Sequence, residues 1–458
     1  MKEQDGLIRD FGLLKATALN MSNMVGIGPF MTIHLIIGAM GGPQAMLGWI
    51  VGVVLAICDG MVWSELSAAM PGSGGTSVYL RECFGRERWG RLMAFLFIWQ
   101  FILSGPLEIA SGAIGVSGYI GFHFMDRSWW REDYFKILGV AISFIAVALL
   151  YRRITAIGRL MVGLWLAMLC TVLFIIGSAM FHFDVSKILP FPPGAFHVDS
   201  RFLFGLGAAM GLAMYDYLGY YDVCYIGDEV KDPERTIPRS VLISVVAVAA
   251  IYMTMNISFI GVLPWQEVID MHTPNGVGTL GIQFVSRLYG DKAAIAFTAL
   301  IVVTGFASVF ALILGYSRIP FAAARDGVFL KWFEHLHPIQ KFPDRSLLVI
   351  GAITMAASLF SLQDVISAIL TCRILVQFIA QNAGLMLYRR KSGRPLPFRM
   401  WLYPIPCWIA LLGWGFIFAT SGWTFILGGV GVILLGVVVF LIWSASAGLW
   451  PFERKSPA

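Results

Sequence analysis

The chain has 458 residues, of which 58% are hydrophobic and only 13% are charged. Average soluble domains carry roughly 25% charged residues, so this composition excludes an ordinary water-soluble globule. The 33 Lys and Arg residues exceed the 27 Asp and Glu residues, which in a soluble protein would suggest a nucleic-acid partner. Most of these basic residues lie in loops between apolar segments, where they indicate membrane topology instead. We expect one domain embedded in the lipid bilayer and no nucleic-acid partner.

Apolar runs long enough to cross a bilayer recur along the whole chain. A helix that spans the roughly 30 Å hydrocarbon layer needs about 20 mainly apolar residues. Such runs predict twelve transmembrane helices: Leu13–Met40, Gln44–Met70, Leu92–Phe122, Tyr134–Tyr151, Ile157–Phe181, Phe202–Ile226, Val241–Leu263, Ala293–Ser317, Leu347–Phe360, Val365–Tyr388, Ile405–Ala419 and Trp423–Leu441. Both ends of the chain and the loops after even-numbered helices hold most of the Lys and Arg residues. The positive-inside rule therefore predicts a multi-pass protein of the cell membrane with both termini cytoplasmic.

The first predicted helix is interrupted near its middle. Gly26, Gly28 and Pro29 lie there. Proline lacks an amide hydrogen and clashes with the preceding turn, while glycine permits non-helical dihedral angles. We expect an unwound segment whose exposed amides, with the positive end of the following half-helix, suit a substrate carboxylate or another anionic group. A proline kink with close glycine packing is the alternative.

The sixth predicted helix has a polar and aromatic middle, from Met214 to Asp222. A carboxylate within a membrane helix is costly unless it faces water or a partner, so Asp216 is a candidate functional residue. Pairing inside the helix bundle is the alternative interpretation. The two interrupted helices occupy corresponding positions if residues 13–181 and 202–388 are five-helix inverted repeats and residues 405–441 form two additional helices.

Other polar residues within the predicted spans have different expected roles. Glu108, in the third span, is a candidate for lining a substrate cavity. Asp59 and Glu65 in the second span are expected to be paired internally. Arg373, in the tenth span, is expected to form a structural ion pair with one of these acids.

Four sequence motifs resemble those of the amino acid, polyamine and organocation transporter superfamily, and the resemblance covers nearly the whole chain. The first is Gly26–Phe30 in the first span, and the second is Ser64–Leu66 near the end of the second span, followed by Pro71–Gly75. The third is Glu229–Pro233 with Thr236–Pro238 after the sixth span, and the fourth is Ala324–Gly327 with Trp332, Phe333, His337 and Pro338 after the eighth. Each motif alone is weak. Their occurrence in the family's order within a twelve-helix chain makes the resemblance specific.

The resemblance implies an all-α membrane fold like that of the leucine transporter. It also implies that a substrate carboxylate binds the amides of the first-helix break, with the substrate amine near unwound carbonyls of the first and sixth helices. Tyr215 falls where the family places an aromatic gate. The substrate-site residues expected from the motifs, together with Glu108, are Gly26, Ile27, Gly28, Tyr215, Asp216, Gly219 and Tyr220.

The chain departs from the family pattern at several of these positions. Ile27 stands where a serine is usual, Pro29 where an aliphatic residue is usual, and Asp216 where a small residue is usual. The run Gly28–Phe30 is instead similar to the polyamine-uptake branch of the superfamily. The fifth helix has no lysine near Ala167, although some proton-coupled or exchanging relatives carry one there.

These features favour a secondary active transporter that moves amino acids by alternating access. The alternative is a polyamine or organic-cation transporter of the same superfamily, with Asp216 and Glu108 holding the cation. An enzyme is disfavoured because no His pair has helical ligand spacing within a span and no phosphate-binding Gly loop is present. No metal, cofactor or catalytic residue is predicted. The coupling ion, proton or sodium, stays open, with Thr304 and Ser308 as candidate sodium ligands.

Overall fold

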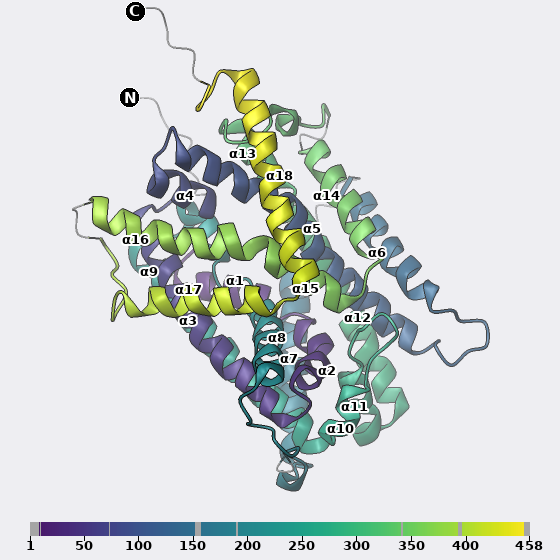
Figure 1. Ribbon diagram of the computed structural model, residues 1–458. Helices are drawn as coiled ribbons and strands as arrows, with labels where there is room; N and C mark the ends of the chain where they lie inside the picture. Colours follow the sequence, from purple (N-terminus) through teal and green to yellow (C-terminus); the bar gives the residue numbers. More distant parts are fainter. Residues whose placement is uncertain are drawn as a thin grey trace, which may run out of the picture.

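The computed structural model describes residues 9, 11–72, 74–151, 157–188, 191–339, 342–392 and 396–452 (Figure 1). Strand-type pairing within these ranges is limited to isolated bridges, Phe11 with Val230 and His272 with Gly278. The long helical segments are α1 (Leu13–Met24), α2 (Gly28–Met40), α3 (Met46–Ala69), α5 (Trp89–Phe122), α6 (Asp133–Tyr151), α7 (Ile157–Met180), α8 (Ser200–Tyr217), α9 (Pro233–Val262), α12 (Asp291–Tyr316), α14 (Asp344–Ala357), α15 (Leu362–Arg373), α16 (Gln381–Ser392), α17 (Ile405–Thr420) and α18 (Trp423–Ala447). Shorter helices connect them: α4 (Thr76–Phe84), α10 (Trp265–Ile269), α11 (Leu280–Tyr289) and α13 (Arg318–Arg325).

Many of these helices meet the length and hydropathy needed to cross a membrane. In the described part of the chain, seven helical spans do so, one of which, Leu362–Lys391, runs through α15, a π-helix and α16. Helices α1 and α2 make an eighth if the bent pair forms one span. The apolar part of α7, Leu166–Met180, and α17 are shorter. Each of the twelve predicted ranges nevertheless contains a helix, so the expected all-α membrane architecture is confirmed.

The first predicted span is broken, as its Gly and Pro residues indicated. Helices α1 and α2 meet at an angle of 54° across Val25, Gly26 and Ile27. Pro29 occupies the first turn of α2, where its missing N–H costs no helical hydrogen bond. The break therefore follows from local residue chemistry.

The sixth predicted span is also interrupted. Helix α8 ends at Tyr217 and is followed by two short 3₁₀ turns, Asp222–Tyr225 and Gly227–Glu229. Gly219 has a φ of 107°, which residues with a side chain rarely adopt. A Cβ at Gly219 would also lie 2.9 Å from the Cβ of Asn23. Glycine thus permits the unwound end of α8 to contact the end of α1.

The tenth predicted span contains a third irregularity that the sequence did not indicate. Helix α15 ends at Arg373 and continues as a π-helix, Ile374–Ala380, before α16 begins. Short π segments within α-helices occur frequently at functional sites. Arg373, the residue before this segment, contacts Ser104 and Glu108 of α5.

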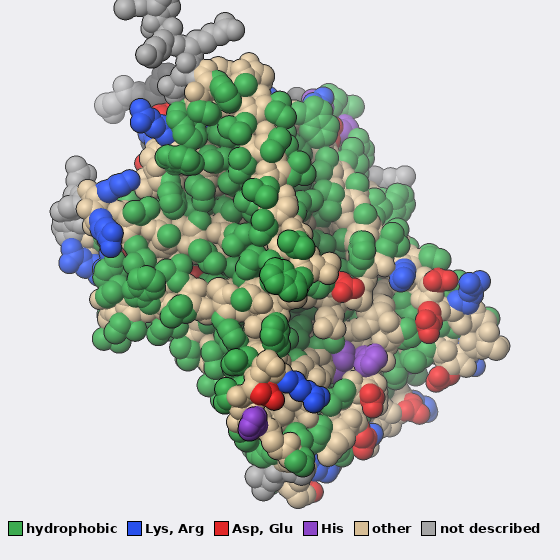
Figure 2. Space-filling view, viewed as in Figure 1, with side chains coloured by type: hydrophobic (Ala, Val, Ile, Leu, Met, Phe, Trp, Pro, Cys, Tyr) green, Lys and Arg blue, Asp and Glu red, His purple; other side chains and the backbone are tan. Residues whose placement is uncertain are grey.

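The helices pack into one bundle in which α5 and α3 make extensive contacts. Helix α3 packs against α8, α9 and α17, while α5 packs against α4, α6, α12, α14 and α15. Apolar side chains cover much of the face shown in Figure 2. Leu427, Leu434 and Ile442 of α18 are among the exposed apolar residues. An apolar outer surface of this kind suits contact with lipid, because polar groups there would lose their hydrogen bonds to water.

Candidate functional site

A cavity of about 510 Å³ lies beside the two broken helices. Its walls come from α1 and the break after it, the unwound end of α8, and the helices α5, α7 and α12. The lining residues are Phe11, Lys15, Ala18, Leu19, Ser22, Asn23, Val25, Gly26, Ile27, Glu108, Met168, Leu218, Gly219, Asp222, Thr304, Ala307, Ser308, Ala311, Leu312, Gly315 and Tyr316. The cavity extends from the helix breaks to the N-terminal end of α1.

The first-helix break presents backbone amides at the inner end of this cavity. The Gly26 N–H donates to the Met24 carbonyl, at 3.0 Å. The N–H groups of Ile27 and Gly28 have no backbone acceptor within the described ranges. Both stand at the positive end of α2, where unpaired amides and the helix dipole favour an anion. The break therefore has the chemistry expected of a carboxylate site.

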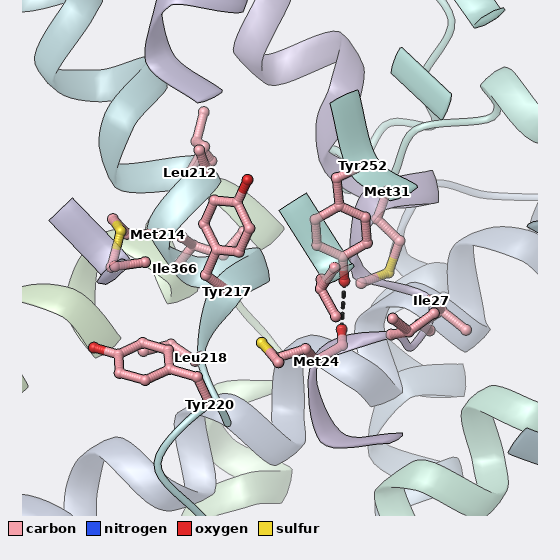
Figure 3. Packing of buried hydrophobic residues seen from close by; sticks show 14 of the residues in the cluster. Met24, Ile27, Met31, Leu212, Met214, Tyr217, Leu218, Tyr220, Tyr252 and Ile366 are labelled. Carbon is pink, nitrogen blue, oxygen red and sulfur yellow. Dashed lines mark hydrogen bonds between the residues drawn. The ribbon is translucent and has the colours of Figure 1, made fainter. Parts of the chain in front are cut away.

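A tyrosine from α9 holds the break in place. The Tyr252 hydroxyl donates to the Met24 carbonyl at 2.5 Å, the bond drawn as a dashed line in Figure 3. The same hydroxyl lies 3.4 Å from the carbonyl of Asp216 on α8. Figure 3 also shows Ile27 and Met31 beside this contact, with Tyr217 and Leu218 on the segment opposite. Tyr252 thus joins the ends of both broken helices.

The structure places the eight expected site residues in two groups. Four of them line the cavity, namely Gly26, Ile27, Glu108 and Gly219, and the other four, Gly28, Tyr215, Asp216 and Tyr220, lie outside its lining. Tyr215 and Asp216 both belong to α8, and their side chains contact α5 and α2 instead of the cavity.

Tyr215 lies between α8 and α5. Its hydroxyl and the Ser111 hydroxyl are 2.7 Å apart. The ring also approaches α2, since a Cβ at Gly28 would lie 3.9 Å from its Cε1. Tyr215 therefore crosses from one wall of the site to the other next to the break.

Asp216 contacts α2 instead of the cavity. The Thr32 hydroxyl donates to its Oδ2 at 2.6 Å. Its Oδ1 faces Gly28, because a Cβ at that glycine would lie 2.6 Å from this oxygen. This position removes one of the two carboxylates on which the organic-cation alternative depended.

Tyr220 belongs to a structural network around Asp59. Its hydroxyl donates to Asp59 Oδ2 at 2.6 Å, and the indole N–H groups of Trp63 and Trp414 donate to the same carboxylate at 3.0 and 3.2 Å. Asp59 is 1% exposed. The prediction that Asp59 is satisfied inside the bundle is confirmed, and Tyr220 is one of its donors.

Glu65, the second internal acid, pairs with a loop-proximal arginine. It accepts two hydrogen bonds from Arg389, one of them to Oε2 at 2.6 Å, and a third from the backbone N–H of Met400 at 2.8 Å. This arrangement joins α3 to α16 and to the segment before α17. The expected internal pairing of Glu65 is also confirmed.

Glu108 lies on the cavity wall but is already engaged. Arg373 Nη2 donates to Glu108 Oε2 at 2.5 Å, and its Nε donates to the Ser104 hydroxyl at 3.2 Å. The Tyr316 hydroxyl donates to the same Glu108 oxygen at 2.8 Å. The expected ion pair of Arg373 is confirmed, with Glu108 as the partner. This pair joins α5, α12 and α15 at the edge of the cavity.

Sequence reasoning missed several polar residues that line the cavity, Asn23 and Asp222 among them. Asn23 Nδ2 donates to Asp222 Oδ2 at 2.6 Å, linking the end of α1 to the turn after α8. Both residues stand immediately beside the two glycine breaks, and this adjacency was the available signal. Thr304 and Ser308 also line the cavity, and the Thr304 hydroxyl donates within its own helix, to the Leu300 carbonyl at 2.8 Å.

Comparison with known proteins identifies the family. Residues 11–445 match the model of a family described as amino acid permease. The serine/threonine exchanger SteT of Bacillus subtilis is 25% identical over 92% of this chain and 92% of its own. The branched-chain amino acid permease BcaP of the same organism is 24% identical over 96% and 94%. An uncharacterised transporter of Mycobacterium tuberculosis is 29% identical over 85% and 83%.

A protein with two broken membrane helices around an amide-lined cavity has the architecture of a secondary transporter. The chain belongs to the amino acid permease family, and its fold is the leucine-transporter type of that family. The relatives compared above are named as transporters, and none of their names describes an enzyme. The family match and these names support amino acids rather than polyamines as substrates.

Proposed function

We propose that this protein is a secondary active transporter that moves amino acids across the cell membrane by alternating access. The observation that carries the proposal is the cavity bounded by both helix breaks, with Ile27 in its lining and the amides of Ile27 and Gly28 without a backbone acceptor in the described ranges. In this proposal the substrate carboxylate binds those amides. The substrate amine binds carbonyls of the unwound segments, which have lost their helical donors.

The cavity also accommodates the rest of the substrate. Met168, Ala307 and Ala311 supply apolar lining, while Thr304 and Ser308 supply hydroxyl groups. The end of the cavity lined by Lys15 lies on the side that the positive-inside rule makes cytoplasmic. In this proposal the conformation is inward-facing, and the contact between Tyr215 and Ser111 closes the site on the opposite side.

Counterflow in liposomes tests the substrate class. Purified protein is reconstituted with an internal amino acid, and uptake of the labelled external compound is measured for a panel of amino acids. For each active amino acid, its methyl ester and its decarboxylated amine are compared as competitors. Competition by the amino acid but not by the ester or amine is expected, because only the acid carries the anion. Equal competition by the amine would contradict the assigned carboxylate site.

A proline substitution tests directly whether the backbone N–H of Ile27 binds the substrate. Ile27 has a φ of −79°, close to the value that proline imposes, so Ile27→Pro removes the N–H with little change of conformation. Ile27→Ala is the matched control, because it shortens the side chain and keeps the N–H. We expect the proline variant to bind substrate about tenfold more weakly than the alanine variant, from the loss of one hydrogen bond to a charged group. Equal affinities would place the carboxylate elsewhere.

A further inference from the structure

Asp216 is a buried carboxylate at the positive end of α2, outside the lining of the cavity. Only 4% of its surface is exposed. Its Oδ2 accepts the hydrogen bond from Thr32, whereas its Oδ1 has no hydrogen-bond partner within the described ranges. Oδ1 faces Gly28, whose lack of a side chain allows the approach. An unpaired acceptor at this depth is costly, so Oδ1 indicates a group that binds there during part of the cycle.

A proton fits this position better than a metal ion. A cation such as sodium needs several oxygen ligands and space between them, whereas Oδ1 lies against the backbone of Gly28. Among the described residues, no three His, Cys, Asp or Glu side chains form a group that could hold a metal. A proton needs one oxygen and no additional space.

The N-terminal end of α2 also provides the proposed substrate site. The N–H groups of Ile27 and Gly28 form the proposed carboxylate site, and Asp216 lies against Gly28 from the other side. A helix N-terminus carries only about half a positive charge, which cannot balance two carboxylates at once. The charge of Asp216 and the charge of a bound substrate therefore compete for one electrostatic partner.

We propose that Asp216 takes up a proton when the substrate carboxylate binds at Ile27 and Gly28, so that a proton travels with the amino acid. This inference rests on the proposed transport function and its carboxylate site. The carboxylate of Asp216 becomes a carboxylic acid by accepting a proton from water. The acid loses that proton to water when the substrate leaves. No bond of the substrate breaks, and no group is oxidised or reduced.

Among the groups around Asp216, we expect only Asp216 itself to change its protonation state during transport. Tyr215 and Tyr217 on its own helix and Tyr252 on α9 are close enough to feel the charge of Asp216, and all three are phenols. Helix α2 contributes the Thr32 hydroxyl, and its only titratable residue, His34, stacks on His272.

The charged groups of the other helices packed on α8 are engaged elsewhere. On α3, Asp59 accepts from Tyr220, Trp63 and Trp414, and Glu65 pairs with Arg389. On α15, Arg373 pairs with Glu108, and Asp364 accepts from Ser361 at the start of the helix. Helix α17 has no charged residue, and the charged residues of α9 are confined to its first turns.

Proton uptake on binding provides the test. Purified protein in weakly buffered detergent solution receives the amino acid that counterflow selects, and a pH indicator dye records the protons taken up. We expect about one proton per bound substrate, and an apparent affinity that falls up to tenfold per pH unit on the alkaline side. In liposomes, an inward proton gradient should drive accumulation, and a protonophore should abolish it.

Asp216→Asn separates the two proposals. The amide keeps the shape and can still accept from Thr32, so we expect substrate-induced thermal stabilisation that no longer varies with pH and no proton uptake. Asp59→Asn is the matched control, a buried membrane carboxylate away from α2, and should keep proton uptake. If Asp216→Asn does not fold, Thr32→Val removes the one hydrogen bond to the carboxylate and should shift the pH dependence of binding to higher pH.

Each outcome distinguishes the failure of one proposal from the failure of the other. Absence of amino acid counterflow by the wild-type protein would refute the transport function. Counterflow without proton uptake, or with sodium rather than protons driving accumulation, would refute the role of Asp216 and leave the transport function intact. Persistent proton uptake by Asp216→Asn would assign the proton to another residue.

Discussion

Breaking the ion pair between Glu108 and Arg373 should destabilise the protein. The loss of stability should differ according to which of the two partners is substituted. The Arg373 side chain is 2% exposed, and the Glu108 side chain is 16% exposed. Glu108→Gln leaves a guanidinium in the bundle interior that has lost its carboxylate partner and keeps its hydrogen bond to the Ser104 hydroxyl. Removing one partner of a buried pair typically costs about 3–5 kcal/mol, because the other charge remains buried and unpaired.

Arg373→Met should cost less than Glu108→Gln, at about 2 kcal/mol, because Glu108 keeps the Tyr316 donor and is partly exposed on the cavity wall. The double variant removes both charges. It should lose less stability than the sum of the single variants, by about 2 kcal/mol, because neither charge is then left alone.

Thermal or denaturant unfolding of the substrate-free protein in detergent measures this double-mutant cycle. The absence of substrate matters because Glu108 also lines the cavity. Additive effects of the two substitutions would refute the reasoning, since additivity means that the two charges do not interact. Equal costs for the single variants would contradict the argument from their different exposure.

Two further substitutions test the packing around the site. Gly219→Ala should destabilise the protein by at least about 1–2 kcal/mol, because its φ of 107° is unfavourable for a residue with a Cβ and that atom would meet Asn23 at 2.9 Å. Gly415→Ala is the control, because a Cβ there would have nothing within 4 Å, and it should leave the unfolding temperature nearly unchanged. A similar loss of stability in both variants would contradict the strain argument. Glu65→Gln should lower the free energy of unfolding by about 3 kcal/mol in the same assay, because it leaves the charge of Arg389 without its carboxylate partner. Unchanged stability would show that this ion pair contributes nothing.

Local sequence chemistry predicted the membrane architecture and the two helix breaks. Long apolar runs can satisfy their backbone in lipid only as helices, so their number and order follow from composition. Gly26, Gly28 and Pro29 act through their own backbone preferences, which do not depend on distant neighbours. The π-helix after Arg373 had no such signal, because its residues are ordinary helix formers.

The roles of the buried acids depended on the tertiary structure. Asp216 and Asp222 lie six residues apart in one polar stretch and look equivalent in the sequence. In the folded chain, Asp216 faces Thr32 on α2, and Asp222 lines the cavity beside Asn23. The end of α8 at Tyr217 changes the direction of the side chains that follow, so helical periodicity cannot be carried across it.

The sequence by itself determined the class of protein, the interrupted helices and the presence of acids that need partners. It determined these because hydropathy, glycine and proline act locally. Only the tertiary structure decided which partners those acids have. Arg373 reaches Glu108 from 265 positions away, and Thr32 reaches Asp216 from 184 positions away. Such pairs form where separate helices pack together, and the packing of α2 against α8 decided that Asp216 borders the amide site instead of entering the cavity.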